Sequence, residues 1–247
     1  MRIIISPAKK MRVETDSLPW RELPCFLERT EYICSQLKAL SAAELKALWK
    51  CNDKILELNL QRLVDMDLRK NLSPAILAYE GIQYQYMAPS VFSQQEFDYI
   101  QEHLRILSGF YGILRPFDGV QPYRLEMQAK LSLEGRRDLY AYWDKLLAEQ
   151  VYSETDCVLN LASKEYSRCI SAYRKPGDRF INCSFGEEKD GKILEKGTLC
   201  KMARGEMVRF LAERQIKRVE EIQAFSGLNY RFSETLSNAE NYIFLAK

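Results

Sequence analysis

The chain has 247 residues, of which 47% are hydrophobic, 28% charged and 11% aromatic, a composition typical of globular proteins rather than disordered or fibrous ones. Thirty-six Lys and Arg against thirty-four Asp and Glu give a formal net charge of +2, so net charge alone does not indicate a polyanionic partner. No apolar run approaches the ~18 residues of a membrane span, and the sequence predicts a cytoplasmic protein without a membrane partner.

The first half of the chain predicts one strand followed by a series of helices. Consecutive β-branched residues over 3–5 indicate a buried strand that ends before Pro7. Ser41 with Glu44 and Ser93 with Glu96 have the spacing of capping boxes, in which each pair satisfies free backbone donors at a helix start. Apolar residues at helical spacing predict helices over 25–40, 53–69, 73–79 (ending at Gly81) and 94–107, with a further helix beginning after Ser41.

The second half mixes strands and helices. Residues 108–127 contain several glycines and prolines, which favour turns. Asp190-Gly191 indicates the turn of a hairpin over 179–197. The other expected elements are helices over 137–150 and 199–214, strands over 157–161 and 241–246, and a polar turn over 162–165. Because these elements show no repeating βαβ rhythm and no linker, we predict a single compact α+β domain over 1–247, with a mixed sheet surrounded by helices.

Charge is segregated along the chain although the total is nearly neutral. Residues 1–12 hold four bases and no acid, residues 164–179 hold five bases and two acids, and residues 192–218 hold eight bases and three acids. If these segments converge in the fold, they form a basic cleft that attracts phosphate backbones. If they do not, they are solvated helix faces paired with nearby glutamates.

The cysteines and the histidine argue against a metal centre. The seven cysteines are scattered without CxxC spacing, and His103 is the only histidine in the sequence. A structural zinc site needs clustered Cys or His ligands, so the sequence predicts no metal, no cofactor and reduced, mostly buried thiols. A single histidine also argues against a His-based catalytic triad.

Ser6 and Lys9 directly follow the first strand, where side chains are held rigidly at a sheet edge. Their spacing also fits the Ser-x-x-Lys pattern of some acylating hydrolases, whose partner motifs are absent here. A lysine that reaches a phosphate is the functional interpretation of Lys9, and an ordinary surface lysine is the alternative.

Residues 104–118 place Arg105 and Arg115 on either side of a turn that contains Gly109 and Gly112. Glycines allow backbone amides to approach a phosphate closely, and the two arginines could clamp it. The segment is similar to helix-hairpin-helix elements that grip DNA backbones, and we expect such an element at about 94–118. A glycine-rich packing turn is the alternative.

Two further clusters combine aromatic, basic and acidic side chains. Tyr123, Arg124 and Glu126 could stack a base and bind phosphate, supply a catalytic carboxylate, or form a structural ion pair. The second cluster lies at the end of the predicted strand 157–161 and contains Asn160, Ser163, Lys164 and Glu165, for which a solvated turn is the alternative.

The predicted helix 199–214 carries Lys201 and Arg204 three residues apart, so the two share a face. Arg209 lies about 80° round the helix from Lys201 and flanks that face. These cations could contact phosphates, and an ordinary solvated amphipathic helix is the alternative.

Taken in order, these segments resemble the YaaA peroxide-stress protein family. The matching pieces are ISPAK at 5–9, AILAYEGIQY at 75–84, LSGFYGILRPFDGVQPYRLEM at 107–127, Leu139, Tyr140 and Trp143, VLNLASKEY at 158–166 and ARGEMVRF at 203–210. The resemblance implies a cytoplasmic bacterial protein that limits damage during hydrogen peroxide stress and is associated with lower free iron. It also implies a single α+β domain of unusual topology that binds double-stranded and branched DNA through a basic cleft and a helix-hairpin-helix-like element.

The resemblance also identifies individual residues that match the family motifs and residues that differ from them. Residues that match family motifs are Lys9, Gly109, Gly112, Arg115, Arg124, Glu126, Lys201 and Arg204. Met202 replaces the second lysine of a KKARG-like run, which makes this helix less basic, and Lys164 makes the NLAS turn more basic. Lys10 is not a motif position.

The leading hypothesis from the sequence is a non-enzymatic protein that binds DNA without reading its sequence and limits iron-dependent damage. The expected DNA contacts are Lys9, Arg105, Gly109, Gly112, Arg115, Arg124, Lys201, Arg204 and Arg209. The rival is an enzyme that acts on a nucleobase or nucleotide in a polar pocket around Lys9, Arg124, Glu126 and Asn160, with Lys9 and Glu126 as the catalytic candidates. Direct iron sequestration lacks a convincing ligand set.

Overall fold

An eight-stranded mixed sheet runs through the computed structural model, which describes residues 1–246. Its path contains, in spatial order, β11 (Tyr230–Phe232), β12 (Asn241–Ala246), β9 (Arg179–Lys189), β8 (Cys157–Leu161), β1 (Arg2–Ile5), β5 (Leu104–Ser108) and β6 (Gly112–Leu114), and β10 (Lys192–Leu194) pairs with β9. The strands from β12 to β5 are parallel to one another, and β6, β10 and β11 are antiparallel to their neighbours. Parallel strands are buried on both faces, which explains the continuous apolar runs of β1 and β8.

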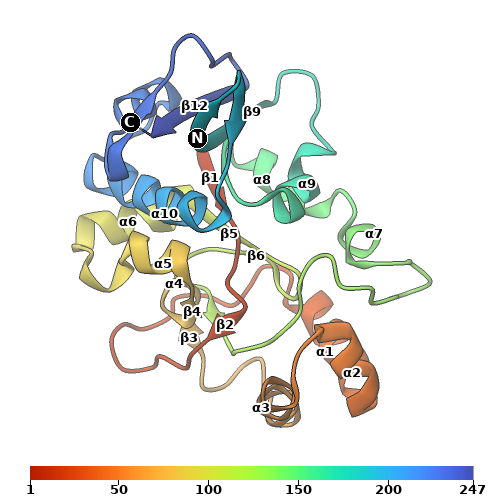
Figure 1. Ribbon diagram of the computed structural model, residues 1–247. Coiled ribbons are helices and arrows are strands. Elements are labelled where there is room, and N and C mark those ends of the chain that lie inside the picture. The colour runs from red at the N-terminus through yellow and green to blue at the C-terminus, as the bar shows by residue number, and fades with distance from the viewer. Residues whose placement is uncertain (247) are drawn as a thin grey trace.

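Helices cover the sheet on both sides. The α-helices are α1 (Leu27–Lys38), α2 (Ala42–Trp49), α3 (Asp53–Val64), α4 (Ala75–Ala78), α5 (Ile82–Met87), α6 (Gln94–His103), α7 (Leu139–Trp143), α8 (Leu146–Ser153), α9 (Lys164–Ser171) and α10 (Gly197–Glu213). Figure 1 shows α5, α6 and α10 on one side of the central strands and α8 and α9 on the other. The described chain also contains short 3-10 helices at Pro89–Val91, Val219–Ala224 and Gly227–Asn229. These findings confirm the predicted α+β class with a mixed sheet surrounded by helices.

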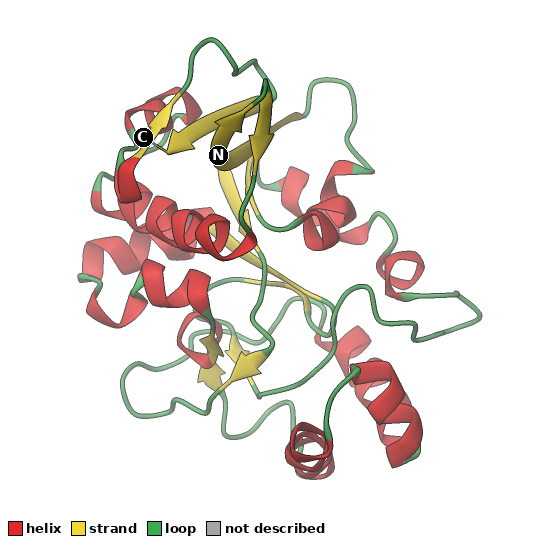
Figure 2. Ribbon diagram, viewed as in Figure 1, coloured by secondary structure: helices red, strands yellow, loops and turns green. Residues whose placement is uncertain are grey.

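Two small antiparallel sheets lie apart from the main one, as Figure 2 shows. In the first, β2 (Lys10–Met11) pairs with β4 (Tyr79–Glu80). In the second, β3 (Ser73–Pro74) pairs with β7 (Gly119–Val120). The β2–β4 pairing places the segment after β1 beside residues 79–80, and this contact forms one border of the candidate site.

Several local predictions are confirmed. Ser41 and Ser93 each accept a hydrogen bond from the backbone N–H of the glutamate three residues later, and each glutamate accepts from the serine N–H in return. Asp190 and Gly191 both have positive φ, 51° and 72°, as the two central residues of a type I′ hairpin turn require. These features depend on a few consecutive residues, which is why the sequence alone predicts them.

The prediction of a helix from 94 to 107 is wrong at its end. The helix α6 ends at His103, and β5 begins at Leu104 and pairs in parallel with β1. Burial beside the central strand outweighs the helical pattern, since strand preference depends mainly on packing context. Segment 94–118 is therefore one helix followed by the β5–β6 hairpin and a loop, without the second helix of a helix-hairpin-helix.

Other element predictions need smaller corrections. The expected helix 137–150 is two helices, because Asp144 between them has a positive φ of 47°. Helix α3 ends at Val64 rather than at 69, and the predicted polar turn at 162–165 contains the start of α9. Gly81, expected to end the helix over 73–79, instead directly precedes α5. The sequence analysis did not predict α5.

Helix α10 packs closely across α5. A Cβ added at Gly205 would lie 2.1 Å from the backbone oxygen of Gln83 and 2.9 Å from the nitrogen of Met87, so only glycine permits this approach. The contact fixes the position of α10, and with it the cations near its N-terminus. None of the helices in the described part of the chain combines the length and the hydrophobicity that a membrane-spanning segment needs.

Candidate functional site

The candidate site is a cavity at the carboxyl ends of β1 and β8. These strands are parallel neighbours, so the residues that follow them meet at one edge of the sheet. The backbone N–H of Ser163, after β8, donates to Ser6 Oγ, after β1, at 2.9 Å. The cavity beside this contact has a volume of about 410 Å³, which lies in the range of small-molecule sites. We call it the main pocket.

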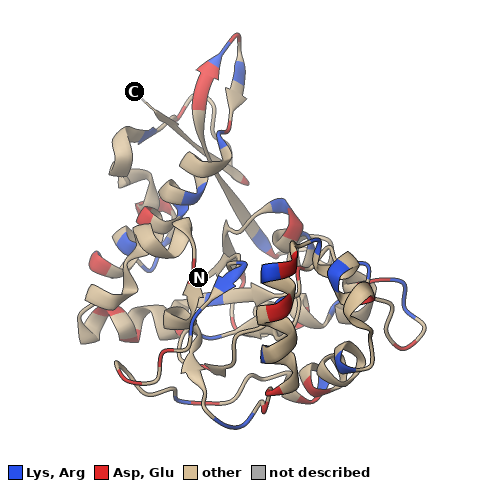
Figure 3. Ribbon diagram, turned by 60° about the horizontal axis from the view of Figure 1, so that its bottom comes forward, with Lys and Arg blue, Asp and Glu red and all other residues tan. Residues whose placement is uncertain are grey.

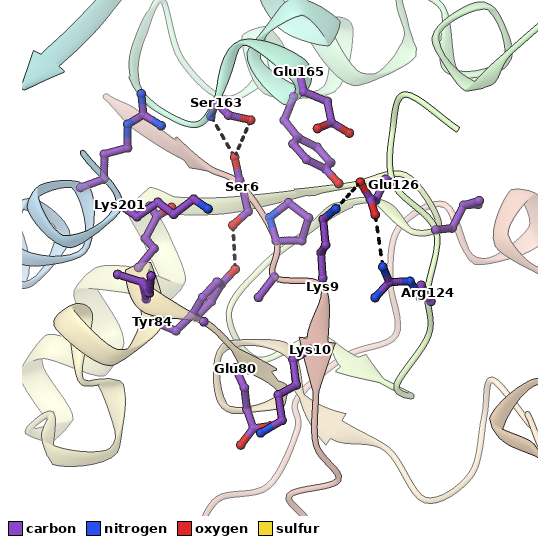
Figure 4. Close-up of a pocket in the computed structure, with 18 of the residues that line it drawn as sticks. Ser6, Lys9, Lys10, Glu80, Tyr84, Arg124, Glu126, Ser163, Glu165 and Lys201 are labelled. Atoms are coloured by element: carbon purple, nitrogen blue, oxygen red, sulfur yellow. Dashed lines mark hydrogen bonds and ion pairs between the residues drawn. The ribbon is translucent and has the colours of Figure 1, made fainter. Parts of the chain in front are cut away.

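Segments far apart in the sequence supply the walls of the main pocket. Its lining comes from residues 6–10 after β1, 80–84 before and in α5, 123–126, the start of α9, and Lys201 and Arg204 of α10. Figure 4 shows these side chains around Ser6 and Lys9. The lining includes five cationic and three carboxylate side chains, which are Lys9, Lys10, Arg124, Lys201 and Arg204 against Glu80, Glu126 and Glu165. The pocket therefore has an excess of positive charge.

One side of the pocket contains a cluster of ion pairs around Glu126. Lys9 Nζ lies 2.9 Å from Glu126 Oε2, and Arg124 Nη2 lies 3.6 Å from Glu126 Oε1. Both cations thus neutralise the same carboxylate, and the ion pair that the sequence analysis left open is present. Lys10 pairs with Glu80 at 3.0 Å at the border of the pocket.

Glu165 is the second carboxyl group of this cluster and has a different environment. It accepts a hydrogen bond from the backbone N–H of Gln128 at 3.2 Å and has no ion-pair partner within residues 1–246. Burial raises the pKa of Glu165, and the negative charge of Glu126 raises it further, while the Gln128 N–H and the Lys9 charge act in the opposite direction. A glutamate of this kind is more readily protonated than an exposed one.

Lys201 and Arg204 are the cations of the pocket that lack acidic partners among the described residues. Neither lies within ion-pair distance of a carboxylate in residues 1–246, and Lys201 is exposed. Arg204 is half-buried, and its Nε is buried without a hydrogen-bond partner in the described chain. Unsatisfied guanidinium and ammonium groups in a cavity are suited to binding an anion.

Three tyrosines give the pocket an aromatic surface. Tyr84, Tyr123 and Tyr166 all line it and are buried. Tyr84 donates its phenolic hydrogen to the backbone oxygen of Ser6 at 3.0 Å. Burial raises the pKa of Tyr123 to about 12, so this phenol stays neutral at physiological pH. Flat, neutral aromatic faces are surfaces on which a base can stack.

The structure thus brings most of the predicted pocket residues together. Those that line the main pocket are Ser6, Lys9, Arg124, Glu126, Ser163, Glu165, Lys201 and Arg204. Asn160 lies nearby in β8 but does not line the pocket. It is buried, donates to Asn182 Oδ1 at 2.9 Å and accepts from the Ala162 N–H at 2.9 Å, so its amide shapes the strand end.

The remaining predicted DNA contacts lie elsewhere and have other partners. Arg105 is 5% exposed and donates from Nε to Glu154 at 2.9 Å. Arg115 donates to Glu22 and to Asp118, and Arg209 pairs with Glu213 at 2.8 Å. Since Arg105 is enclosed, its guanidinium cannot reach a phosphate in this structure.

Gly109 and Gly112 are buried in the β5–β6 hairpin rather than presented to solvent. A Cβ on Gly109 would lie 2.8 Å from the Leu125 oxygen, and the Gly109 oxygen itself accepts from the Trp143 indole at 3.0 Å. Gly112 has a φ of +75°. Both glycines therefore serve packing and turn geometry, which is the alternative that the sequence analysis left open.

Sequence reasoning missed part of the pocket. Lys10, Glu80 and Tyr84 line it, although Lys10 is outside the family motifs and the segment 75–84 contributed only a match to those motifs. The one available signal was the unusually polar and aromatic sequence from Tyr79 to Tyr84. That signal does not reveal which side of the molecule the segment faces.

A second groove lies on the other side of α9. It has a volume of about 370 Å³, and its lining comprises Lys164, Ser167, Arg168, Ser171, Arg174, Phe180, Asn182 and Glu240. Lys164, Ser167, Arg168 and Ser171 lie on one helical face, while Ser163, Glu165 and Tyr166 line the main pocket. Three cations against one carboxylate make this groove basic as well.

Many charged side chains of the described chain form ion pairs with one another. Figure 3 shows Lys and Arg interspersed with Asp and Glu along the helices and on the β9–β10 hairpin. Bases of the three basic segments that pair with nearby acids include Arg12, Arg174, Arg179, Lys196, Arg209 and Arg218. The basic segments therefore converge only in part, at the main pocket and the groove beside it.

Residues 1–246 contain no group of three or more His, Cys, Asp or Glu side chains arranged to hold a metal ion. Of the seven cysteines, five are buried, namely Cys34, Cys157, Cys169, Cys183 and Cys200. Burial raises the pKa of Cys183 and Cys169, so these thiols are poor nucleophiles at physiological pH.

Comparison with known proteins shows which family this chain belongs to. A family model described as "Peroxide stress protein YaaA" matches residues 1–236. The chain belongs to this family. The match includes every segment that lines the main pocket, from Ser6 to Arg204.

Individual relatives match over nearly their whole length. A UPF0246 protein of Agathobacter rectalis is 53% identical over 247 residues, which cover 100% of this chain and 99% of the relative. A UPF0246 protein of Lachnoclostridium phytofermentans is 52% identical, with 99% and 96% of the two chains covered. One of Pediococcus pentosaceus is 49% identical, with 99% and 98% covered. Membership of the YaaA family supports a role in the response to peroxide stress.

Proposed function

We propose that this YaaA-family protein binds DNA in the cytoplasm without reading its sequence, and thereby limits iron-dependent damage during peroxide stress. The observation that carries the proposal is the convergence of Lys9, Arg124, Lys201 and Arg204 on one pocket from three separate regions of the chain. Lys201 and Arg204 have no acidic partner in residues 1–246, so they can neutralise phosphates without first breaking an ion pair.

The basic surface extends beyond the main pocket. Lys164 and Arg168 line the groove on the other side of α9, and Arg174 lines it while paired with Glu240 at 3.1 Å. Phosphates on either side of a nucleotide at the main pocket would follow this surface. Cations that contact phosphates give affinity without sequence information. Double-stranded or branched DNA is the partner that we propose for it.

The proposal predicts a salt-dependent affinity that the cations of α10 control. Fluorescence anisotropy of duplex and junction DNA is measured across about 50–300 mM salt, where released counterions give a log-linear slope. The double variant Lys201→Glu/Arg204→Glu should weaken binding at least tenfold and reduce the slope, because it removes two phosphate contacts and adds repulsion.

The matched control is Lys54→Glu/Lys217→Glu, which makes the same change in net charge at two exposed lysines outside both cavities. It should bind DNA almost as well as the wild type. Equal losses in the two double variants would show that only overall charge matters and would contradict a role for the pocket. Absence of DNA binding by the folded wild type would also overturn the proposal.

A second function is supported by Glu165. This carboxyl group, with its raised pKa, lies in a pocket that also contains Lys9, Glu126 and unpaired cations. Such a pocket can bind a free nucleotide and transfer protons to it. Displacement of labelled DNA by a nucleoside monophosphate would favour this second function, whereas displacement by inorganic phosphate at the same concentration would indicate anion binding alone.

A further inference from the structure

The main pocket has two chemically different sides. In Figure 4, Lys201 lies on one side of Ser6, while Glu126 and Glu165 lie on the other. A phosphate at Lys201 and Arg204 would thus leave the rest of a bound nucleotide directed toward the two glutamates. The groups that can transfer protons are consequently placed away from the phosphate, on the side that the sugar and base would occupy.

The two glutamates differ in the way that an acid–base pair requires. Glu126 lies between Lys9 Nζ at 2.9 Å and Arg124 Nη2 at 3.6 Å, so both of its carboxylate oxygens face a cation. Glu165 has no ion-pair partner in residues 1–246, and burial raises its pKa. Two carboxyl groups of one site, one held between cations and the other without an ion-pair partner, are a usual arrangement for acid and base catalysis.

We propose that Glu165 and Glu126 together hydrolyse the N-glycosidic bond of a nucleotide whose phosphate is bound by Lys201 and Arg204. This inference rests on the second function above, that the main pocket binds a nucleotide. Tyr84, Tyr123 and Tyr166 line the same pocket and would provide aromatic contacts for the base.

The reaction needs only water as co-substrate. Glu165 donates its proton to the base nitrogen as the C1′–N bond breaks and its electron pair goes to the base. Glu126 accepts a proton from water, whose oxygen forms the new bond to C1′. The products are the free base and the sugar phosphate. One proton has left Glu165 and one has reached Glu126, so transfer between the two carboxyl groups restores the starting state.

The first experiment uses the wild-type protein with the common ribonucleoside and deoxyribonucleoside 5′-monophosphates. Free base is measured by chromatography, and binding is measured in parallel by calorimetry. A 5′-labelled single-stranded oligonucleotide tests the same bond inside a DNA chain, where base loss creates an alkali-labile position. We expect base release from at least one of these substrates, with the free and polymeric arms identifying the source of the nucleotide.

Variants then separate the roles of the two carboxyl groups. Glu165→Gln and Glu126→Gln should each lower kcat by about 10²–10⁴-fold on an ordinary nucleotide, the usual contribution of a general acid or base. Glu57→Gln is the matched control, because Glu57 is exposed on α3 and lies outside the pocket. Its activity should equal that of the wild type.

A substrate that needs no proton donor makes the assignment specific. The base of 7-methylguanosine 5′-monophosphate is already cationic and leaves without protonation. Glu165→Gln should therefore retain activity on this nucleotide, whereas Glu126→Gln should not. The wild-type rate on ordinary nucleotides should decline as pH rises above the Glu165 pKa, because the proton donor is lost. Equal loss of activity on both substrates in Glu165→Gln would contradict its role as the acid.

The outcomes distinguish this inference from the functions on which it rests. Nucleotides that bind the wild type with no base released from any substrate would overturn the hydrolysis and leave the binding function standing. Failure to bind either nucleotides or DNA would overturn both. The wild-type measurements decide between these cases even if a variant fails to fold.

Discussion

Arginines and lysines in this protein differ in function according to burial and partners. Arg105 is enclosed and donates to Glu154, which also pairs with Arg2 at 2.8 Å. Lys201 is exposed beside the main pocket and has no acidic partner in residues 1–246. Both are basic residues of predicted DNA-contacting segments, but only Lys201 is available to an anion.

Replacing Arg105 should affect stability and leave DNA binding unchanged. Arg105→Met removes charge-assisted hydrogen bonds to Glu154 and should lower the free energy of unfolding by about 2–3 kcal/mol. Urea unfolding measures this loss, and anisotropy under native conditions should show wild-type DNA affinity. Lys201→Glu is the contrasting variant, with nearly unchanged stability and weaker DNA binding. A tenfold loss of DNA affinity in folded Arg105→Met would contradict the structural role of Arg105.

At the scale of elements, the contact between α5 and α10 holds two walls of the pocket together. Gln83 and Tyr84 of α5 line the pocket, and α10 supplies Lys201 and Arg204. The two helices approach each other closely at Gly205, which directly follows Arg204 and lies about one turn after Lys201. Close packing here determines how far Lys201 lies from Ser6.

Gly205→Ala should disturb both stability and binding. The added Cβ would overlap backbone atoms of α5, which cannot move aside as a flexible side chain can, so the free energy of unfolding should fall by about 1–3 kcal/mol or more. Binding of DNA should weaken because α10 is displaced. Gly197→Ala in the same helix is the control, since nothing lies within 4 Å of its added Cβ, and its stability should stay within about 1 kcal/mol of the wild type. Equal stability of the two variants would contradict this account.

At the scale of the whole molecule, Asp118 links several segments into one folded unit. It accepts from the Arg115 N–H at 2.8 Å and from Arg115 Nε at 3.1 Å, while its own backbone oxygen accepts from Ala75 at 2.9 Å. Arg115 keeps partial access to solvent and also pairs with Glu22. Asp118 is only 1% exposed, so burial disfavours the charged form of this carboxyl group. Burial raises the pKa of Asp118 from 3.8 to about 6 despite the Arg115 charge.

This shift predicts a pH dependence of stability. The folded protein binds the Asp118 proton more tightly than the unfolded chain does, so this contribution favours folding at low pH and is lost as pH rises from about 4 to about 6. A shift of this size corresponds to about 3 kcal/mol. The stability of the wild type relative to Asp118→Asn should decline by about 2–3 kcal/mol between about pH 4 and pH 7. Urea titrations across this range measure the difference, and a constant difference would contradict the raised pKa.

Local features of this fold follow from short stretches of sequence. The capping boxes at Ser41 and Ser93 and the turn at Asp190-Gly191 each depend on interactions among a few neighbouring residues, and all three are predicted correctly. The sequence motifs also predict the YaaA family, which the match over residues 1–236 confirms. Of the candidate DNA contacts, Lys9, Arg124, Lys201 and Arg204 line one pocket, and their contact with DNA stays a prediction.

Only the tertiary structure decides which charged residues meet. The apolar spacing in 94–107 favours a helix, but pairing with β1 makes Leu104–Ser108 a strand and buries Arg105 within it. In the same way, the parallel pairing of β1 with β8 brings Ser6 to Ser163, and no local preference of either segment encodes that meeting. Sequence by itself determines the capped helix starts, the hairpin turn and the family, because these depend on local geometry and recognisable motifs. The order of strands in the sheet determines the pocket, because that order results from burial of apolar surface over the entire chain.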